Sequence, residues 1–102
     1  MSDVQISVVI PVYNEQANLP TLMQRLVAVM EGMSKRYEII LVDDGSRDDS
    51  LNMMKDYAKQ PYVKVVELTR NYGQHAAIMA GFSVSRGDIV VTMDADLQNP
   101  PE

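Results

Sequence analysis

Polar and acidic residues directly follow four short apolar runs of the sequence. The four polar groups are Pro11-Val12-Tyr13-Asn14-Glu15, Asp43-Asp44-Gly45-Ser46, Arg70-Asn71-Tyr72-Gly73 and Asp94-Ala95-Asp96-Leu97-Gln98. In an open parallel α/β sheet, ligands bind at the carboxyl ends of the strands. If the apolar runs are parallel strands, these groups therefore meet at one edge of the sheet and can form one ligand site.

The charge of this edge predicts a bound cation. Its carboxylates belong to Glu15, Asp43, Asp44, Asp94 and Asp96, and the one obvious cation beside them is Arg70. Like charges held close together cost free energy unless something neutralises them. Mg²⁺ is typically held by one or two carboxylates while substrate phosphates complete its shell. Mn²⁺ also suits oxygen ligands, so the sequence leaves the choice between the two ions open.

Asp94 and Asp96 are the best candidates for metal ligands. Residues at positions i and i+2 of a strand face the same side, so both carboxylates can reach one ion. A lone Asp-x-Asp is weak evidence, since many such pairs mark turns or helix caps. Its place after a buried strand strengthens the metal interpretation.

The other groups admit two interpretations each. Asp43 and Asp44 can belong to a strand-to-helix turn, in which Gly45 supplies unusual backbone angles, or they can bind a ribose or a base. Tyr13 and Glu15 can be ordinary loop residues, or they can offer a ring face and a hydrogen-bond acceptor to a nucleoside.

Strands and helices alternate along the chain. Short β-branched runs predict strands at residues 6–10, 39–42, 63–68 and 89–93. Apolar residues at helical spacing predict helices from about residue 19 to 33, 48 to 59 and 74 to 85. The third of these is apolar on nearly every side, so we expect it to be buried. The pattern predicts an α/β fold, a Rossmann-like parallel sheet with helices on both faces.

Composition restricts the classes of partner. The 102-residue chain has 14 acidic and 9 basic residues, for a net charge of −5. This charge argues against nucleic acid or an anionic membrane surface held by simple electrostatics. The absence of cysteine and the single histidine exclude a disulfide framework and thiolate or histidine-rich metal sites. Because no apolar run approaches the ~20 residues of a membrane span, we expect this chain itself to be soluble and cytoplasmic.

Together the four groups resemble the motifs of the family 2 glycosyltransferases in residue type, order and spacing, over residues 6–102. The chain is most similar to the branch that uses polyprenyl phosphates. Residues 70–75, 78–82 and 96–102 point within it to bacterial enzymes that transfer a modified arabinose to undecaprenyl phosphate for lipid A modification. Dolichyl-phosphate mannose synthases and undecaprenyl-phosphate glucosyl transferases are the alternatives.

The resemblance implies the nucleotide-binding half of a GT-A fold and an inverting, metal-dependent transfer from a UDP-sugar to a polyprenyl phosphate. The implied nucleotide-sugar-binding residues are Pro11, Tyr13, Glu15, Asp43, Asp44, Asn71 and Asp94. The implied ligands of Mg²⁺ or Mn²⁺ are Asp94, Asp96 and Gln98. The first loop would hold uracil and ribose, and one of the paired aspartates would contact the base.

The resemblance also implies that the full enzyme is longer. A GT-A domain continues with an acceptor half, and this branch adds C-terminal membrane helices at the cytoplasmic side of the bacterial inner membrane. We therefore expect residues 1–102 to bind donor without turnover, with any general base beyond Glu102. The fourth predicted strand would then be an exposed edge, which invites self-association.

Two other classes remain open. A phosphoacceptor signalling domain is also a small parallel α/β unit, but it would have acidic residues directly after the first strand. A non-catalytic nucleotide-binding or assembly module would bind nucleotide without strong metal dependence. A dinucleotide-binding oxidoreductase is disfavoured, because the first turn lacks Gly-x-Gly-x-x-Gly.

Overall fold

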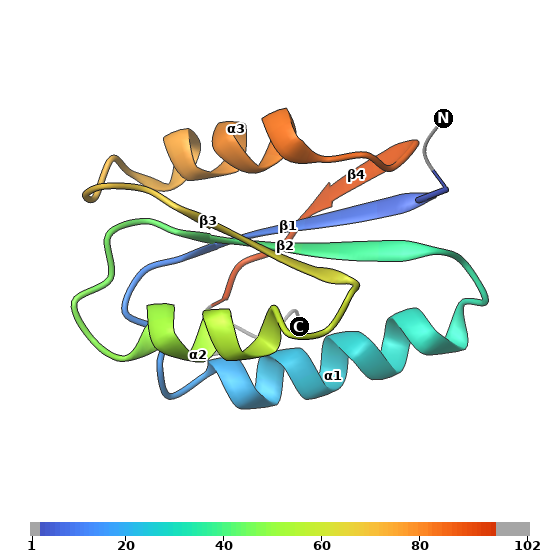
Figure 1. The fold of residues 1–102 in the computed structure, drawn as a ribbon, viewed down its shortest axis with the longest axis horizontal. Coiled ribbons are helices and arrows are strands. Elements are labelled where there is room, and N and C mark those ends of the chain that lie inside the picture. The colour runs from blue at the N-terminus through green and yellow to red at the C-terminus, as the bar shows by residue number, and fades with distance from the viewer. Residues whose placement is uncertain (1–2, 96–102) are drawn as a thin grey trace, which may run out of the picture.

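One sheet of parallel strands organises the computed structural model, which describes residues 3–95. The elements are β1 (Ile6–Val12), α1 (Leu19–Gly32), β2 (Tyr37–Asp43), α2 (Ser50–Tyr57), β3 (Val63–Glu67), α3 (Gln74–Val84) and β4 (Ile89–Thr92). The strand order is β3-β2-β1-β4, and every pair is parallel. Helices α1 and α2 lie on one face and α3 on the other (Figure 1). The predicted α/β class and parallel sheet are confirmed.

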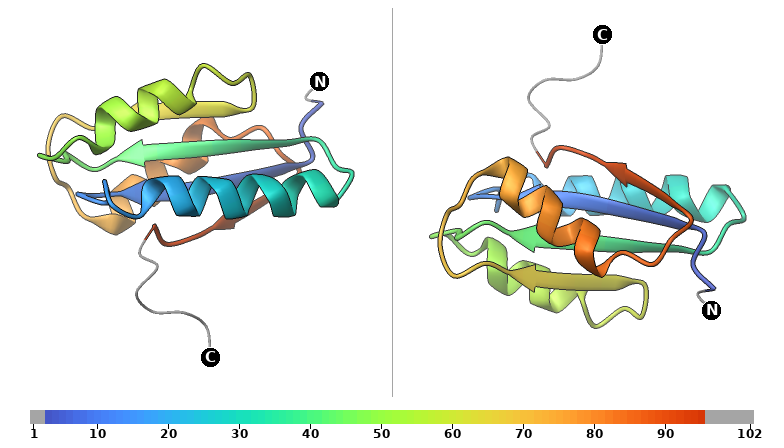
Figure 2. Two further views of the ribbon diagram at one scale, coloured as in Figure 1. Left: turned by 90° about the horizontal axis from the view of Figure 1, so that it is seen from below. Right: turned by 90° about the horizontal axis from the view of Figure 1, so that it is seen from above.

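The register brings the strand ends to one edge. β1 pairs in step with β2 from Ile6 and Tyr37 to Val12 and Asp43. β3 ends level with β2, because Glu67 pairs with Asp43. The loops that follow β1, β2 and β3 therefore leave the sheet at the same end (Figure 2). The predicted convergence of the polar groups follows from this geometry.

β1 extends past the proline at which we expected it to stop. Pro11 pairs with Val42 inside the β1–β2 ladder. Proline has no N–H to donate, so it is tolerated in a strand where no neighbour needs that donor. The last β1–β4 pair joins Val9 to Thr92, so Pro11 lies beyond the end of β4 and its missing donor costs nothing.

The main core lies between the sheet and α1. The apolar stripe of α1 buries Leu19, Leu22, Met23, Leu26 and Met30. These side chains pack against the inward residues of the central strands, which include Val8, Ile10, Ile39 and Leu41. Helical spacing predicts a stripe that also includes Val27 and Met33. Of these two, Val27 is partly buried, whereas Met33 follows the helix and is exposed. Within residues 3–95 no helix has the length and apolar character needed to cross a membrane.

The expectation that α3 is buried was wrong. Only Ala77 and Gly81 of this helix are buried, while Met79 is 52% exposed and Phe82 is 40% exposed. Among the described elements α3 covers its face of the sheet alone, so no second helix packs on its outer side (Figure 1). Gly81 allows a close approach to the sheet, since a Cβ there would lie 2.3 Å from Cγ1 of Val9.

β4 is an edge strand, as predicted, and β3 lies at the opposite edge of the sheet. It pairs with β1 through Ile6 to Val9, and among the described residues no strand pairs with its other side. All four of its residues are exposed, with Ile89 at 60%. Its apolar sequence therefore does not place it in the interior, in contrast to β1 and β2.

A buried carboxylate ties the amino end of the sheet together. Glu38 is 3% exposed, and its Oε2 accepts hydrogen bonds from Ser7 Oγ (2.6 Å) and from the backbone N–H of Arg86 (2.7 Å). Lys64 Nζ lies 2.8 Å from its Oε1. Burial alone would raise the pKa of Glu38, but the hydrogen bonds from Lys64, Ser7 and Arg86 outweigh it and lower the pKa.

Glu38→Gln should lower the free energy of unfolding by about 2 kcal/mol near pH 7, because charged hydrogen bonds are lost in a buried site. The folded-state pKa lies below the ordinary value of 4.5, so this stabilisation is present above that value. It should disappear as the pH falls through the folded-state pKa. Urea unfolding of both proteins over a pH series measures the difference.

Asp56→Asn is the matched control for Glu38→Gln. Asp56 pairs with Lys59 at 3.0 Å, but both side chains are more than 70% exposed. Exposed pairs contribute little, so this variant should change the free energy of unfolding by less than about 0.5 kcal/mol. Equal effects at the two positions would contradict the assignment of Glu38 as a structural anchor.

The open edge of β4 predicts that two copies of the chain associate through this strand. Val91→Lys should weaken that association, because a lysine on an edge strand opposes pairing with another chain. Gln24→Lys on α1 adds the same charge at an exposed position away from β4 and should leave association unchanged. Sedimentation velocity over a concentration series tests this, and a wild-type chain that stays monomeric at high concentration would contradict it.

Candidate functional site

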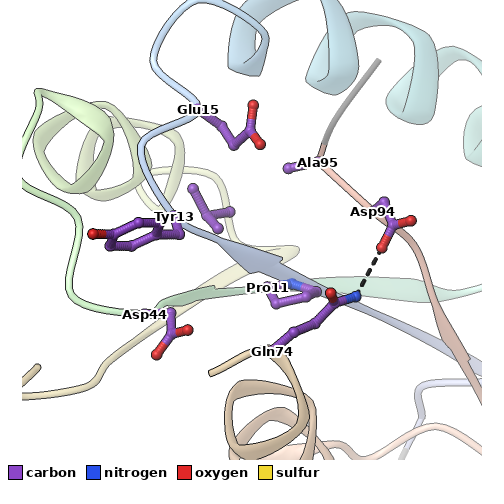
Figure 3. A pocket seen from close by; sticks show the side chains of 8 residues that line it. Pro11, Tyr13, Glu15, Asp44, Gln74, Asp94 and Ala95 are labelled. Carbon is purple, nitrogen blue, oxygen red and sulfur yellow. Dashed lines mark hydrogen bonds between the residues drawn. The ribbon is translucent and has the colours of Figure 1, made fainter. Parts of the chain in front are cut away.

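A cleft of about 310 Å³ lies at the carboxyl edge of the sheet. Its lining residues are Pro11, Val12, Tyr13, Glu15, Asp44, Gln74, Asp94 and Ala95. The labelled side chains in Figure 3 surround this space from β1 and the loops that follow β1, β2 and β4, and from the first residue of α3. Five of the predicted nucleotide-sugar residues, Pro11, Tyr13, Glu15, Asp44 and Asp94, are thus brought together.

The remaining predicted residues lie elsewhere. Asp43 and Asn71 line a neighbouring cavity of about 300 Å³, and Tyr13 lines both cavities. Asp43 is buried, and its Oδ1 accepts a hydrogen bond from the backbone N–H of Ser46 at 3.3 Å. Asp96 and Gln98, the other predicted metal ligands, lie outside the described residues.

The loop after β1 is locked to the loop after β2. Asn14 adopts a positive φ of 54°, a conformation that asparagine tolerates better than most residues. Its backbone N–H donates to Ser46 Oγ at 2.9 Å, and its Oδ1 accepts from the backbone N–H of Arg47 at 2.7 Å. The neighbouring Glu15 N–H donates to the buried Ser50 Oγ at 2.9 Å. Tyr13 and Glu15 are therefore carried on a fixed loop.

Glu15 is further oriented by the residue before α1. Nδ2 of Asn18 donates to its Oε1 at 2.8 Å. Asn18 occupies the N-cap position of α1, but its side chain makes no capping hydrogen bond. The amide is used to hold the Glu15 carboxylate beside the cleft instead.

Asp44 organises the loop between β3 and α3. This residue is 3% exposed, and its carboxylate accepts hydrogen bonds from the backbone N–H groups of Tyr72 (2.8 Å) and Gly73 (3.1 Å). Nδ2 of Asn71 lies 3.3 Å from the same carboxylate and 3.1 Å from the Asp44 carbonyl oxygen. N–H donors stabilise the ionised form of a carboxylate. The negative charge of Asp44 is thus compensated without a metal or a basic side chain.

The loop that follows β2 and the loop between β3 and α3 also touch directly, at Gly45. This residue has a φ of +78°, and a Cβ there would lie 2.5 Å from the backbone nitrogen of Asn71. Both the backbone conformation and the space therefore require glycine. The turn interpretation of Asp43-Asp44-Gly45-Ser46 is correct as far as Gly45 is concerned. Asp44 lines the cleft, and its contact to a ribose or a base stays a prediction.

Asp94 is the described member of the predicted metal site. Its Oδ1 accepts a hydrogen bond from Gln74 Nε2 at 2.9 Å (Figure 3). Within residues 3–95 no group of three or more His, Cys, Asp or Glu residues is placed to hold an ion. One or two carboxylates are enough for a Mg²⁺ ion whose shell is completed by phosphates and water. The exposed oxygen donors of Asp94 at the cleft suit that mode of binding.

Sequence reasoning missed three lining residues: Val12, Gln74 and Ala95. Gln74 was recognised only as the start of a helix and as part of the run that begins at Arg70. The sequence signal that could have identified Gln74 as a lining residue is its position directly after Gly73, at the carboxyl edge of the sheet. Ala95 is buried and lines the cleft.

The fold and the cleft define a class of protein. In an open parallel α/β sheet, ligands bind at the carboxyl ends of the strands, which is where this cleft lies. The model of the family named Glycosyl transferase family 2 matches residues 7–102. The chain therefore belongs to the family 2 glycosyltransferases, and its sheet is the nucleotide-binding half of a GT-A fold, as the motifs predicted.

Known proteins agree with this assignment. The chain is 60% identical over 100 residues to an undecaprenyl-phosphate 4-deoxy-4-formamido-L-arabinose transferase of Enterobacter sp. (strain 638), covering 96% of this chain and 31% of that protein. A protein of the same name from Pseudomonas fluorescens (strain SBW25) is 60% identical over 99 residues, covering 95% and 29%. The chain thus spans about a third of the length of these relatives.

Solved structures of glycosyltransferases share the fold. S. aureus TarS in complex with UDP-GlcNAc superposes with a TM-score of 0.77 at 26% identity, over 91% of this chain and 27% of that one. Glucosyl-3-phosphoglycerate synthase from Mycobacterium tuberculosis, in complex with Mn²⁺, UDP and glucosyl-3-phosphoglycerate, gives a TM-score of 0.73 at 28% identity. It is matched over 95% of this chain and 35% of that one.

Asp44→Asn should loosen the loop between β3 and α3, because an amide offers one acceptor oxygen where the carboxylate offers two. We expect the free energy of unfolding to fall by about 1–3 kcal/mol, because buried donors would be left unpaired. Amide hydrogen exchange should quicken at Tyr72 and Gly73. The exposed Asp49→Asn, which affects a contact to Asn52 at 2.9 Å, is the control. Unchanged exchange at both amides in Asp44→Asn would refute the role of Asp44.

Proposed function

We propose that this chain is the donor-binding part of an enzyme that transfers a sugar from a UDP-sugar to undecaprenyl phosphate in cell-envelope or lipid A modification. The observation that carries the proposal is the joint placement of Tyr13, Asp44 and Asp94 around one cleft at the carboxyl edge of the sheet. The names of the curated relatives support the acceptor. The nucleotides bound to the structural neighbours support a UDP donor.

The cleft offers the groups that a nucleoside needs. The ring of Tyr13 is 42% exposed and can lie against a base or ribose. A carboxylate has about four acceptor positions, and Asp44 uses three of them on N–H donors of the chain. One position remains for an N–H of the base. Glu15, held by Asn18, can accept from a ribose hydroxyl. The proposed nucleotide-sugar site also includes Pro11 in the cleft, and Asp43 and Asn71 in the adjoining cavity.

The diphosphate end of the donor would lie toward Asp94. We propose that Asp94, Asp96 and Gln98 hold Mg²⁺ or Mn²⁺, which would neutralise charge on the nucleoside diphosphate as it leaves. The cation also allows an anionic ligand to approach an acidic edge.

The acceptor needs little activation by the residues that the structure describes. The phosphate oxygen of a polyprenyl phosphate is already ionised near neutral pH, so it needs less help from a general base than a sugar hydroxyl does. Its attack on the anomeric carbon from the face opposite the nucleotide would invert the configuration. We assign no general base to the described residues. We propose that the acceptor site and the attachment to the cytoplasmic face of the membrane belong to another part of the enzyme. That part corresponds to the additional length of the relatives.

Calorimetric titration of UDP into the chain, with Mn²⁺ and then with EDTA, tests the donor site. We expect binding with Mn²⁺ and at least tenfold weaker binding with EDTA. Asp94→Asn, alone or with Asp96→Asn, should weaken binding in Mn²⁺ by a similar factor. Asp88→Asn is the matched control, because Asp88 is exposed just before β4, at the opposite end of that strand.

Each other outcome has a distinct meaning. Binding that ignores both EDTA and Asp94→Asn would favour the non-catalytic nucleotide-binding module over the transferase. No binding by a folded wild-type chain would contradict a donor site assembled from these residues. Detectable transfer of sugar to a lipid phosphate by the 102-residue chain would contradict the proposal that it binds donor without turnover.

A further inference from the structure

Gln74 makes the one side-chain contact to Asp94 that the structure describes. It is the first residue of α3, and its Nε2 donates to Asp94 Oδ1 at 2.9 Å across the cleft (Figure 3). Both side chains line that cleft. The nucleotide-sugar site proposed above assigns no role to Gln74.

The backbone that carries Gln74 is firmly held. The N–H of the preceding Gly73 donates to Asp44 Oδ2 at 3.1 Å, and the Gly73 carbonyl accepts from the N–H of Ala77 at 3.1 Å. Ala77 is fully buried against the sheet. The amide of Gln74 therefore projects from a fixed point into the cleft.

Asp94, in contrast, follows a strand that is held on one side only. β4 pairs with β1 alone among the described strands, and all four of its residues are exposed. The backbone hydrogen bond next to Asp94 joins the Met93 N–H to the Val9 carbonyl at 3.1 Å. The side chain of Asp94 is itself exposed. Because packing does not fix this carboxylate, the hydrogen bond from Gln74 is the one described side-chain interaction that orients it.

The chemistry of an amide suits this task. Gln74 occupies one acceptor position on Oδ1 and leaves Oδ2 and the remaining positions of Asp94 open. It carries no charge, so it orients the carboxylate without cancelling the negative charge that attracts a cation. A lysine or arginine in its place would compete with that cation.

We propose that Gln74 is a positioning residue that holds the Asp94 carboxylate toward the cleft. The inference rests on the proposed function, in which Asp94 takes part in metal-dependent donor binding. Partners that orient a metal ligand typically contribute 10–100-fold to metal affinity. Gln74 would exert that effect without touching the donor.

Gln74→Met tests the proposal, since methionine has a similar shape and no N–H donor. Titration of UDP in the presence of Mn²⁺ should show binding weakened by about tenfold. The hydrogen bond is exposed, so the unfolding midpoint should stay at the wild-type value. Gln24→Met, the same exchange at an exposed position of α1, should alter neither quantity.

A second measurement needs no ligand. In a ¹⁵N-labelled chain without metal or nucleotide, the side-chain amide resonances of Gln74 should shift in Asp94→Ala, because their acceptor is gone. They should stay in place in Asp88→Ala. Unshifted Gln74 resonances in Asp94→Ala would overturn the positioning role, whatever the ligand titrations show.

The outcomes separate this inference from the proposed function. Wild-type binding of UDP with Mn²⁺ that Gln74→Met leaves unchanged overturns the inference and keeps the donor site. Absence of metal-dependent binding in the wild type removes the donor site, and the amide resonances then decide whether Gln74 holds Asp94. A lowered unfolding midpoint in Gln74→Met would show a structural role and would also count against the inference.

Discussion

Two buried carboxylates, one at each end of β2, fasten helix α3 to the sheet. Glu38, near the start of the strand, accepts the backbone N–H of Arg86 just after the helix. Asp44, directly after the strand, accepts the backbone N–H of Gly73 just before it. Between these two points the helix packs Ala77 and Gly81 on Val9 and Val42 of the sheet. The two hydrogen bonds hold the backbone at either end of α3, and the one at Gly73 lies beside the cleft.

This arrangement gives the acidic edge a different meaning from the one that charge counting suggests. The count of carboxylates treated Asp43, Asp44 and Asp94 alike, as charges in need of a cation. In the structure Asp44 is satisfied by N–H donors, and Asp43 accepts the N–H of Ser46. Asp94 alone of these three is exposed at the cleft with most of its acceptor positions open. The prediction of a bound cation from like charges therefore applies to Asp94 rather than to the whole edge.

The sequence predicted the features that depend on local patterns. The β-branched runs located the strands, and parallel order then placed Tyr13, Asp44 and Asp94 at one edge. The sequence did not predict the hydrogen-bond partners of Asp44. Two of them are backbone N–H groups, whose direction depends on how the loop between β3 and α3 approaches Asp44 and on Gly73, which has a φ of 103°. The exposure of α3 was missed because an apolar composition cannot show how many neighbours a helix has. Gln74 was missed because the acceptor of its side chain lies 20 residues away. The assignments of Asp96 and Gln98 as metal ligands stay predictions.

The pairing of β1 with β4 also sets an order of events during synthesis. Ile6 pairs with Ile89, so the first strand of the chain completes its ladder only with the last described one. A chain emerges from the ribosome with its N-terminal part first, and pairing across such a distance carries the entropic cost of closing a long loop. β1, β2 and β3 can join beneath α1 and α2 while one edge of β1 is still open. A ligand that contacts Asp94 therefore arrives too late to guide these early steps, which depend on the β1–β2 and β2–β3 ladders and on the apolar packing of the helices.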